Sequence, residues 1–248
     1  MDFLCIIQAR TNSTRLPKKV LMPLGDKIVL QHVIERVKRS KRIDETIIAT
    51  TISKEDLPIV RLCCDMGIRV FCGSEEDVLD RYYQVAKIIR PKNIVRVTSD
   101  CPVIDSTLID EMISVFLKTE ADYSWIENYP DGLDAEVFKF EALEDAWLHA
   151  KLNSEREHVT PYINNRDNVL KKISLKSDIN FTAKRWTLDE ERDYEFLKII
   201  FDNLYYENNN FNYKEILSFI NENPEIENIN CGIIRNEGYF NSLLKDNV

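Results

Sequence analysis

A basic loop follows the first apolar run of the chain. The stretch ARTNSTRLPKK carries four cationic side chains, those of Arg10, Arg15, Lys18 and Lys19. Arginine can hold phosphate oxygens through two parallel hydrogen bonds, and lysine acts as a point charge. Small residues such as Ser13 let backbone N–H groups approach an anion. The loop therefore indicates a polyphosphate site, although a solvated basic turn would explain the same residues.

The loop matches neither of the two common glycine-rich phosphate motifs. The G-x-x-x-x-G-K-S/T spacing of a P-loop is absent, and so is the G-x-G-x-x-G fingerprint of dinucleotide-binding folds. Phosphate binding here would depend on local positive charge and on the backbone N–H groups of the loop.

Two aspartates follow later predicted strands. Asp100 ends the run NIVRVTSD, and Asp189 ends the run KRWTLD. Magnesium prefers oxygen ligands and commonly takes one or two carboxylates together with phosphates and water. Each aspartate has an alternative role as a helix cap. For the helix that follows Asp100, however, Asp105 offers a separate cap. We expect Asp193 to serve the start of the following helix rather than a metal.

The second half of the chain supplies further candidates for substrate contacts. Asp134 and Glu136 lie two residues apart in the predicted strand DAEVFKF, so they share one face, which is costly unless the acids are solvated, paired or bound to a ligand. Arg156 and His158 in REHVTPYI are candidate sugar or phosphate contacts. No serine or cysteine pairs visibly with this histidine, so a Ser–His or Cys–His mechanism has no support. Arg81 lies off the apolar stripe of its predicted helix and is a candidate nucleotide contact.

Alternating strands and helices must position these residues. Apolar runs predict strands, and apolar residues at helical spacing predict helices. In chain order the predicted strands cover 3–9, 46–51, 68–73, 93–100, 135–140, 171–177 and 184–188. The predicted helices cover 28–39, 57–67, 77–90, 106–118, 141–150, 155–163, 192–207 and 213–223. The stretch from Ile226 to Val248 has no assigned structure.

This order of elements predicts an α/β fold of one domain, residues 1–248. Nearly continuous apolar strands that alternate with helices indicate a mostly parallel, doubly wound sheet with helices on both faces. Ligands of such sheets bind beyond the carboxyl ends of the strands, where the basic loop and Asp100 lie. We expect the second half to complete the sheet and to add a small insertion lobe over the site.

Composition narrows the class of protein. The chain of 248 residues has a net charge of -9, with 44% hydrophobic and 30% charged residues. An acidic protein does not bind nucleic acid or anionic lipid by bulk attraction, so no nucleic-acid or membrane partner is expected. No apolar stretch is long enough to span a bilayer and no signal peptide is recognisable, so we expect a cytoplasmic protein. The six scattered cysteines are expected to be reduced and buried.

Seven motifs in the expected order resemble one enzyme family. They are the opening stretch IIQARTNSTRLPKKVLMPLGDKIVLQHVIERVKRS, then ATT, DVLDRYYQVA, VRVTSDCPVID, DGLDAEVF, REHVTPYI and RWTLDEERDYEFL. Together they are similar to the cytidylyltransferases that include CMP-Kdo and CMP-acylneuraminate synthetases, with the proteins called spore coat polysaccharide biosynthesis protein F as the nearest members. The resemblance covers roughly the first four-fifths of the chain.

The resemblance implies a fold of the nucleotide-diphospho-sugar transferase type, with residues 1–120 binding nucleotide and 121–248 binding acceptor. It implies that the first loop grips the triphosphate of CTP, and it implies Mg²⁺ held by Asp100 and Asp189. The family usually has glycine where this chain has Lys18, whose side chain would either crowd the phosphate or add a charge. The implied nucleotide contacts are Ala9, Arg10, Ser13, Arg15, Lys19, Arg81 and Ser99; the implied catalytic residues are Arg10, Arg15, Lys19 and Asp100; the implied acceptor contacts are Asp134, Glu136, Arg156 and His158.

The expected reaction joins CTP to a sugar acceptor and releases pyrophosphate, for surface polysaccharide or glycan biosynthesis. An acidic sugar would react through its anomeric hydroxyl, and a sugar phosphate would react through its phosphate; the sequence leaves both open. A glycosyltransferase that consumes a nucleotide sugar is a second interpretation, although a diphosphate needs less positive charge than this loop carries. A non-catalytic nucleotide-binding module is the third. Relatives often form homodimers, and residues 135–163 would be the expected contact region.

Overall fold

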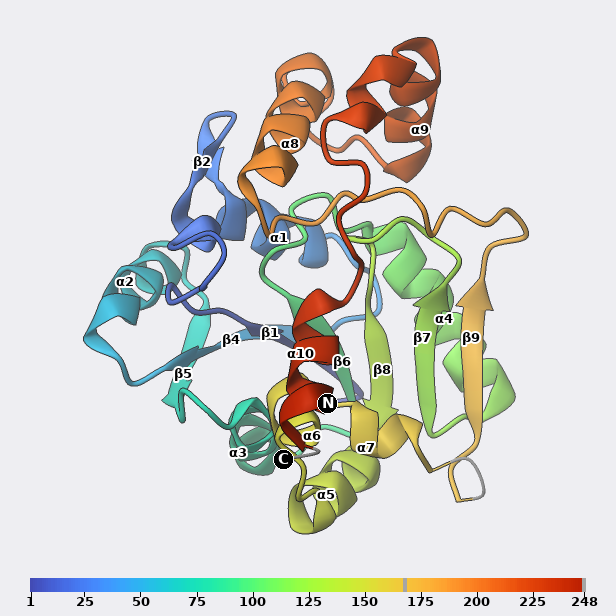
Figure 1. Cartoon of the computed structure of the whole chain (residues 1–248). Coiled ribbons are helices and arrows are strands. Elements are labelled where there is room, and N and C mark those ends of the chain that lie inside the picture. The colour runs from blue at the N-terminus through green and yellow to red at the C-terminus, as the bar shows by residue number, and fades with distance from the viewer. Residues whose placement is uncertain (167–168, 247–248) are drawn as a thin grey trace.

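The computed structural model describes residues 1–166 and 169–246. Within them, one seven-stranded sheet has the order β5–β4–β1–β6–β8–β7–β9 (Figure 1). Its strands are β1 (Phe3–Gln8), β4 (Glu45–Thr51), β5 (Arg69–Gly73), β6 (Asn93–Thr98), β7 (Tyr123–Glu127), β8 (Glu136–Lys139) and β9 (Lys172–Lys176). Strand β8 runs antiparallel to both neighbours, and the other adjacent pairs of this sheet are parallel. The predicted mostly parallel α/β sheet is confirmed.

Strand β1 lies inside the sheet and is buried on both faces. Phe3, Cys5 and Ile7 pack into one apolar cluster, whereas Leu4 and Ile6 pack into the other. Successive side chains of a strand point to opposite faces, so an uninterrupted apolar run is what a strand covered on both sides requires. The basic loop follows this buried strand directly and therefore starts from a rigid base.

Helices cover both faces of the sheet. One cluster packs under α1 (Val29–Val37), α2 (Leu57–Asp65), α4 (Ser106–Thr119), α8 (Glu191–Leu204) and α9 (Tyr213–Glu222). The other packs under α3 (Val78–Ile89), α5 (Phe140–His149) and α7 (Pro161–Asn164). Strands of both halves of the chain share the one sheet. Because helices cover both of its faces, the arrangement is doubly wound (Figure 1).

The predictions differ from the structure at three places. The predicted strand 184–188 makes only an isolated bridge between Arg185 and Asp131, because its backbone bonds first to Asp131 and then, at Leu188, to Asp100 rather than along one neighbouring strand. The predicted helix 155–163 is two short helices, α6 (Asn153–His158) and α7, separated by Val159 at φ 72°. Strand β7 was not among the predicted strands, although it lies between β8 and β9.

The C-terminal stretch without a predicted structure forms a helix. Residues Pro224–Asn228 make a 3₁₀ turn, and α10 (Glu237–Asp246) packs against α6 in front of the sheet (Figure 1). Two further short 3₁₀ turns (Lys19–Leu21 and Lys54–Asp56) and a small hairpin of β2 (Pro23–Leu24) and β3 (Lys27–Ile28) complete the elements. The apolar residues Tyr239, Phe240, Leu243 and Leu244 lie at helical spacing, a signal for α10 that the sequence analysis did not use.

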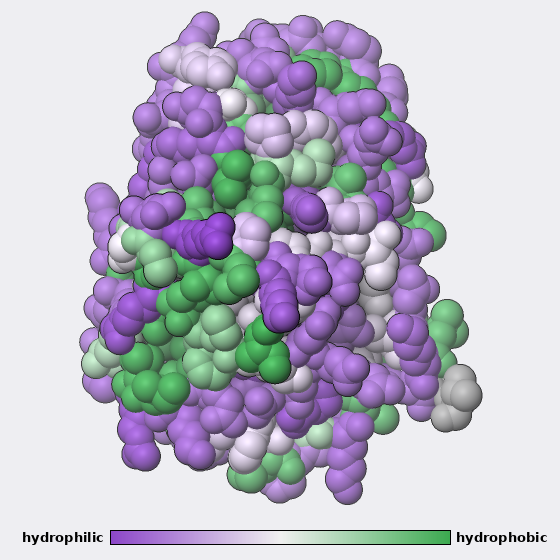
Figure 2. Space-filling model, turned by 90° about the vertical axis from the view of Figure 1, so that its left-hand side faces the viewer, coloured by the Kyte–Doolittle hydropathy of each residue, from purple (hydrophilic) through white to green (hydrophobic). Residues whose placement is uncertain are grey.

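Strand β5 is an open edge of the sheet. Figure 2 shows apolar side chains on the side of the molecule that carries β5 and α2.

Cys64 and Cys72 are exposed in this region, and Cys231 is exposed elsewhere, so the prediction of buried cysteines was wrong for these three. All six cysteines are free thiols, as expected. Among the described residues, no helix has the length and hydropathy needed to cross a membrane.

Candidate active site

A cavity of about 780 Å³ opens where β1 and β6 end. The residues that follow these two strands line it, as the rule for parallel α/β sheets predicts. Every candidate residue from the sequence lines this cavity except Arg156. On the nucleotide side these are Ala9, Arg10, Ser13, Arg15, Lys19, Arg81, Ser99, Asp100 and Asp189; on the acceptor side they are Asp134, Glu136 and His158.

Arg156 does not face the cavity. Its Nε donates to Asp77 Oδ2 at 2.9 Å, its Nη2 also pairs with that carboxylate, and its Nη1 donates to the carbonyl oxygen of Trp147. Asp77 is the N-cap of α3, so Arg156 ties α6 to the start of α3. The structure therefore gives Arg156 a structural ion pair instead of a substrate contact.

Lys19 joins the two aspartates that the sequence singled out. Its Nζ lies 2.7 Å from Asp100 Oδ2 and 2.7 Å from Asp189 Oδ1. Burial alone would lower the pKa of this ammonium, but Asp100 and Asp189 outweigh burial and raise it. Burial opposes the ionised form of Asp100 as well, yet Lys19 lowers the pKa of Asp100 to about 2. Lys19 and Asp100 are therefore both charged at neutral pH.

Asp189 is held by two arginines besides Lys19. Its Oδ2 lies 3.0 Å from Arg15 Nη2 and 3.1 Å from Arg185 Nη2. Arg185 is buried and also pairs with Asp131 and with both oxygens of Asp193. Asp193 in turn accepts from the backbone N–H groups of Asp189 and Glu190 at the start of α8. This confirms that Asp193 serves the helix start, and it leaves the Asp189 side chain free of any capping role.

Asp105 likewise relieves Asp100 of a capping role. The Asp105 side chain accepts a hydrogen bond from the backbone N–H of Thr107 at 2.8 Å and so caps α4. Asp100 therefore points into the cavity rather than onto the helix. This is the arrangement that the sequence predicted for the pair.

A buried aspartate fixes the shape of the basic loop. Asp56 Oδ1 accepts from both the backbone N–H and the hydroxyl of Thr11, each at 2.7 Å, and Oδ2 accepts from the hydroxyl of Thr51. Burial would raise the pKa of Asp56, but these hydrogen bonds outweigh it and lower the pKa. Thr11 thus serves the loop and not a ligand, and the start of the loop is clamped to the end of β4.

Lys18 adopts the left-handed backbone conformation that glycine favours. Its φ is 61° and ψ is 20°, and its N–H donates to the carbonyl oxygen of Thr11 at 2.8 Å. The side chain is exposed and does not line the cavity. The loop therefore accommodates lysine at the position where the resemblance implies glycine, and the side chain neither crowds the cavity nor adds a charge to its lining.

Two further cations line the nucleotide side. Arg81 is buried, donates from Nη1 to the carbonyl oxygen of Ala49 at 3.2 Å, and has its pKa lowered by burial. Arg10 has no hydrogen-bonded or ion-paired partner among residues 1–166 and 169–246. Arg10 is thus the cation on this side with the greatest freedom to meet an anion.

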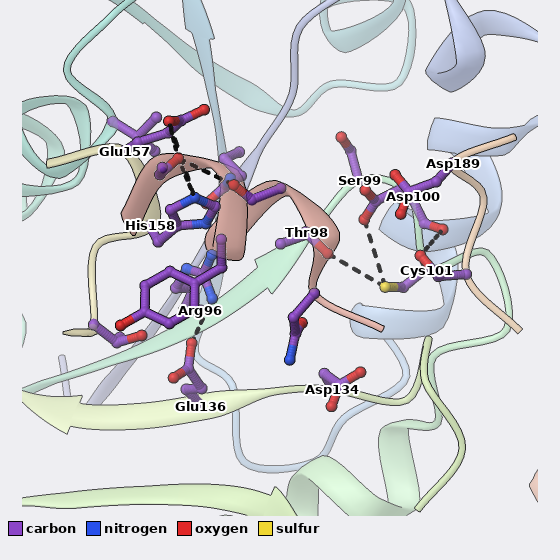
Figure 3. A pocket seen from close by; sticks show the side chains of 18 of the residues that line it. Arg96, Thr98, Ser99, Asp100, Cys101, Asp134, Glu136, Glu157, His158 and Asp189 are labelled. Atoms are coloured by element: carbon purple, nitrogen blue, oxygen red, sulfur yellow. Dashed lines mark hydrogen bonds and ion pairs between the residues drawn. The ribbon is translucent and has the colours of Figure 1, made fainter. Parts of the chain in front are cut away.

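The acceptor side has its own charged groups. Asp100 and Asp189 lie together at one end of the cavity in Figure 3, while Arg96, Glu136 and His158 lie at the other. Arg96 Nη1 donates to Glu136 Oε2, and the Tyr123 hydroxyl donates to Glu136 Oε1, both at 2.5 Å. Glu136 is therefore paired, which offsets the cost of placing it on the same face as Asp134.

Asp134 and His158 are partnered by the C-terminal residues. Arg235 Nη2 lies 2.6 Å from Asp134 Oδ1. His158 Nε2 lies 3.1 Å from the hydroxyl of Ser242, which donates to Glu157 at 2.6 Å. Burial lowers the pKa of His158, so its imidazole is neutral at pH 7.

The loop before β8 needs a glycine. Gly132 has φ +104°, and a Cβ there would lie 2.5 Å from the carbonyl carbon of Trp186. The loop carries Asp131, whose pKa is raised to about 7 by burial and by the neighbouring carboxylate of Asp134. Close contact between this loop and residues 185–187 is what places Asp131 and Asp134 beside the aspartate pair.

Asp100 and Asp189 fit a magnesium site. Their oxygens converge on one cationic atom, Nζ of Lys19, at 2.7 Å each. No group of three or more metal-binding side chains occurs in the described part of the chain, so the remaining ligands of an ion would come from phosphate and water. Such a ligand set is typical of Mg²⁺ bound with a nucleotide.

Several residues of the site were missed by the sequence analysis. Arg96 had a usable signal, because a charged residue inside the apolar run NIVRV is unusual. Asp56 and Arg185 had none, because their partners lie far away in sequence. The C-terminal contributions of Arg235 and Ser242 come from the stretch that had no assigned structure.

Comparisons with known proteins agree on one family. A sequence model described as Cytidylyltransferase matches residues 4–223. An uncharacterized protein of Methanocaldococcus jannaschii is 43% identical over 94% of this chain and 96% of its own length. Spore coat polysaccharide biosynthesis protein SpsF of Bacillus subtilis is 37% identical over 90% of this chain and 96% of its own. The solved structure of a cytidylyltransferase from Leptospira borgpetersenii is 32% identical, with TM-score 0.88, over 95% of this chain and 100% of that one.

Proposed function

The chain belongs to the cytidylyltransferase family, and we propose that it transfers the cytidylyl group of CTP to a sugar acceptor in surface polysaccharide or glycan biosynthesis, with release of pyrophosphate. The observation that carries this proposal is the meeting of the basic loop with Asp100 and Asp189 in one cavity. A triphosphate needs dense positive charge, and Arg10, Arg15 and Lys19 provide it at the end of a buried strand.

The proposed reaction is a direct displacement at phosphorus. An acceptor oxygen attacks the α-phosphorus, a new P–O bond forms, and the bond to the bridging oxygen of the β-phosphate breaks. Pyrophosphate leaves with the electron pair of that bond. Catalysis then depends on positioning and on charge stabilisation, because no covalent enzyme intermediate is needed.

Each group on the nucleotide side has a proposed role. Arg10, Arg15 and Lys19 bind the phosphates and stabilise the charge of the departing pyrophosphate. Asp100 and Asp189 would hold Mg²⁺, which when bound neutralises charge on the α-phosphate. Lys19 then exchanges its carboxylate partners for phosphate oxygens.

The acceptor side is proposed to recognise a sugar. The carboxylates of Asp134 and Glu136 can accept hydrogen bonds from sugar hydroxyls, and His158 lies on the same side of the cavity. Arg96 offers a partly buried guanidinium at the same end, and its pKa is raised because Glu136 outweighs the effect of burial. It therefore stays charged and suits an acceptor that carries an anionic group.

The test is pyrophosphate release with magnesium from each of the four nucleoside triphosphates. Each is combined with a panel of Kdo-type sugars, nonulosonic acids and sugar phosphates. We expect release with CTP and at least one acceptor. In Asp100→Asn we expect turnover at saturating Mg²⁺ to fall by about 10²-fold or more, as for the loss of a group that stabilises developing charge.

Asp202→Asn is the matched control, since Asp202 is exposed on α8 and the substitution changes charge in the same way. Its turnover should equal that of the unmodified protein. Unchanged turnover in Asp100→Asn would remove the metal-binding role. Release of free CMP or UDP from a nucleotide sugar, in place of pyrophosphate, would replace the proposed reaction with glycosyl transfer.

A further inference from the structure

The last residues of the chain close one side of the cavity. We call residues 231–246 the C-terminal strap. It runs in front of the sheet (Figure 1), and Glu237, Tyr239, Ser242 and Lys245 contribute to the cavity lining. The match to the family model ends at residue 223, before the strap begins.

Polar contacts join the strap to three separate parts of the site. Glu237 Oε2 lies 2.9 Å from Arg15 Nη1 in the basic loop. Arg235 pairs with Asp134 in the loop before β8. Ser242 bonds to Glu157 and His158 at the end of α6. The strap thus occupies groups on both the nucleotide side and the acceptor side.

Few apolar contacts hold the strap down. Ser242 is the buried residue of α10, whereas Ile234, Phe240 and Leu244 are 62%, 54% and 69% exposed. Segments with little buried apolar surface open at a low free energy compared with the core. Release of the strap therefore requires the loss of a few polar contacts and of the edge-on contact between Tyr239 and His158, and it leaves the sheet and its covering helices intact.

The two ends of the strap are fixed while its middle can move. Before it, buried Asn230 donates from Nδ2 to the carbonyl oxygen of Arg185 at 2.9 Å and to Asp193 at 3.0 Å. At its end, Asp246 accepts from the backbone N–H of Ser154. Between these points Gly232 has φ 81° with open space around it, which makes this glycine suited to act as a hinge.

We infer that the strap closes the acceptor side of the nucleotide-free enzyme, and that a bound triphosphate releases Glu237, in the middle of the strap, from Arg15. Arg15 cannot pair fully with both Glu237 and a phosphate. Once the phosphate takes this arginine, the Glu237 carboxylate faces a second negative group, and like charges repel. The acceptor then enters after the nucleotide, so substrate binding is ordered. This inference rests on the proposed function, because it requires a triphosphate at Arg15.

Calorimetric titration with CTP and Mg²⁺ tests the competition directly. Glu237→Gln removes the charge that competes for Arg15, so its CTP dissociation constant should be about two- to fivefold lower than that of the unmodified protein, the range for a partly exposed ion pair. Glu225→Gln is the matched control, because Glu225 is exposed and has no partner among the described residues. Its affinity should be unchanged.

Hydrogen exchange of the amides in residues 235–246 gives a second readout. CTP with Mg²⁺ should speed their exchange in the unmodified protein, and Glu237→Gln should show fast exchange before CTP is added. If the unmodified protein and Glu237→Gln bind CTP tightly with equal affinity, and if hydrogen exchange does not change, the inference about the strap is wrong while the proposed transfer reaction stands. If neither the unmodified protein nor Glu237→Gln nor Glu225→Gln binds CTP, the proposed function and the inference about the strap are both wrong.

Discussion

At the scale of single residues, the site is organised by one lysine between two acids. Asp100 and Asp189 would repel each other if they faced an empty cavity, and Lys19 compensates both at 2.7 Å. Arg15 and Arg185 add two further positive charges around Asp189. The nucleotide side therefore contains more cations than acids, which suits a polyanion in a protein whose net charge is -9.

The buried His32, which lies outside the site, should make the free energy of unfolding depend on pH. His32 packs edge-on against the rings of Phe201 and Tyr205 and bonds to the carbonyl oxygen of Leu24 at 2.6 Å, and burial lowers its pKa to about 4. The unfolded chain binds the proton more tightly than the folded one. His32 therefore lowers stability as pH falls from about 6.5 towards 4, with full effect below the folded value.

The expected loss is about 3 kcal/mol between pH 7 and pH 4, from an ordinary pKa of 6.5 and a folded pKa of about 4. Urea unfolding at several pH values measures it. His32→Gln should flatten this part of the profile. The exposed His149→Gln is the control and should leave the slope unchanged. Equal slopes in His32→Gln and the unmodified protein would show that another group controls the acid response.

At the scale of elements, the conformation of the basic loop explains its one departure from the family pattern. The resemblance implies glycine at position 18, and Lys18 has the left-handed backbone that glycine adopts without steric cost. Thr11 on Asp56 also holds the loop, and the contact that Lys18 makes to Thr11 uses its backbone N–H, which glycine would supply as well.

Lys18→Gly should therefore stabilise the protein by about 0.5–1 kcal/mol, since it relieves backbone strain that exceeds the added entropy of the unfolded chain. The midpoint of urea unfolding measures the change. Lys38→Gly is the control: Lys38 is exposed at φ -63°, so glycine there should destabilise. Turnover should be unchanged in Lys18→Gly, because the lysine side chain does not line the cavity. A lower stability of Lys18→Gly would show that the backbone of Lys18 is not strained.

At the scale of the whole molecule, Arg185 connects segments that are distant in sequence. It pairs with Asp131 before β8, with Asp189 of the site and with Asp193 of α8. Three carboxylates placed this close are compatible with folding only if a buried cation compensates them. The acceptor loop, the candidate metal site and α8 are thus joined through one guanidinium.

Arg185→Lys should lower the free energy of unfolding by about 3 kcal/mol, because an ammonium cannot satisfy the three carboxylates that the planar guanidinium contacts. Thermal unfolding measures the loss. Arg192→Lys, at an exposed arginine of the same region, should change stability by no more than about 0.5 kcal/mol. A similar small change in Arg185→Lys would show that the network contributes little to stability.

Much of the fold and the composition of the nucleotide side could be predicted from the sequence. Apolar runs and helical spacing are local signals, and they identified the parallel strands of the first half and the loops at their ends. Arg10, Arg15, Lys19 and Asp100 could be selected because a parallel sheet brings the carboxyl ends of its strands to one edge. The roles proposed for these residues depend on the experiments above.

What the tertiary structure alone decided concerns pairing over long distances. Arg156 has the residue type of a substrate contact, and only the position of Asp77 shows that it is a structural partner. Residues 184–188 resemble a strand by composition, but their backbone bonds to two different loops. The position of the C-terminal strap has no local signal, because polar contacts with distant residues, such as Arg15 and Glu157, hold it over the cavity. Local patterns record which residues prefer burial, whereas charge pairing depends on where the folded chain brings each partner.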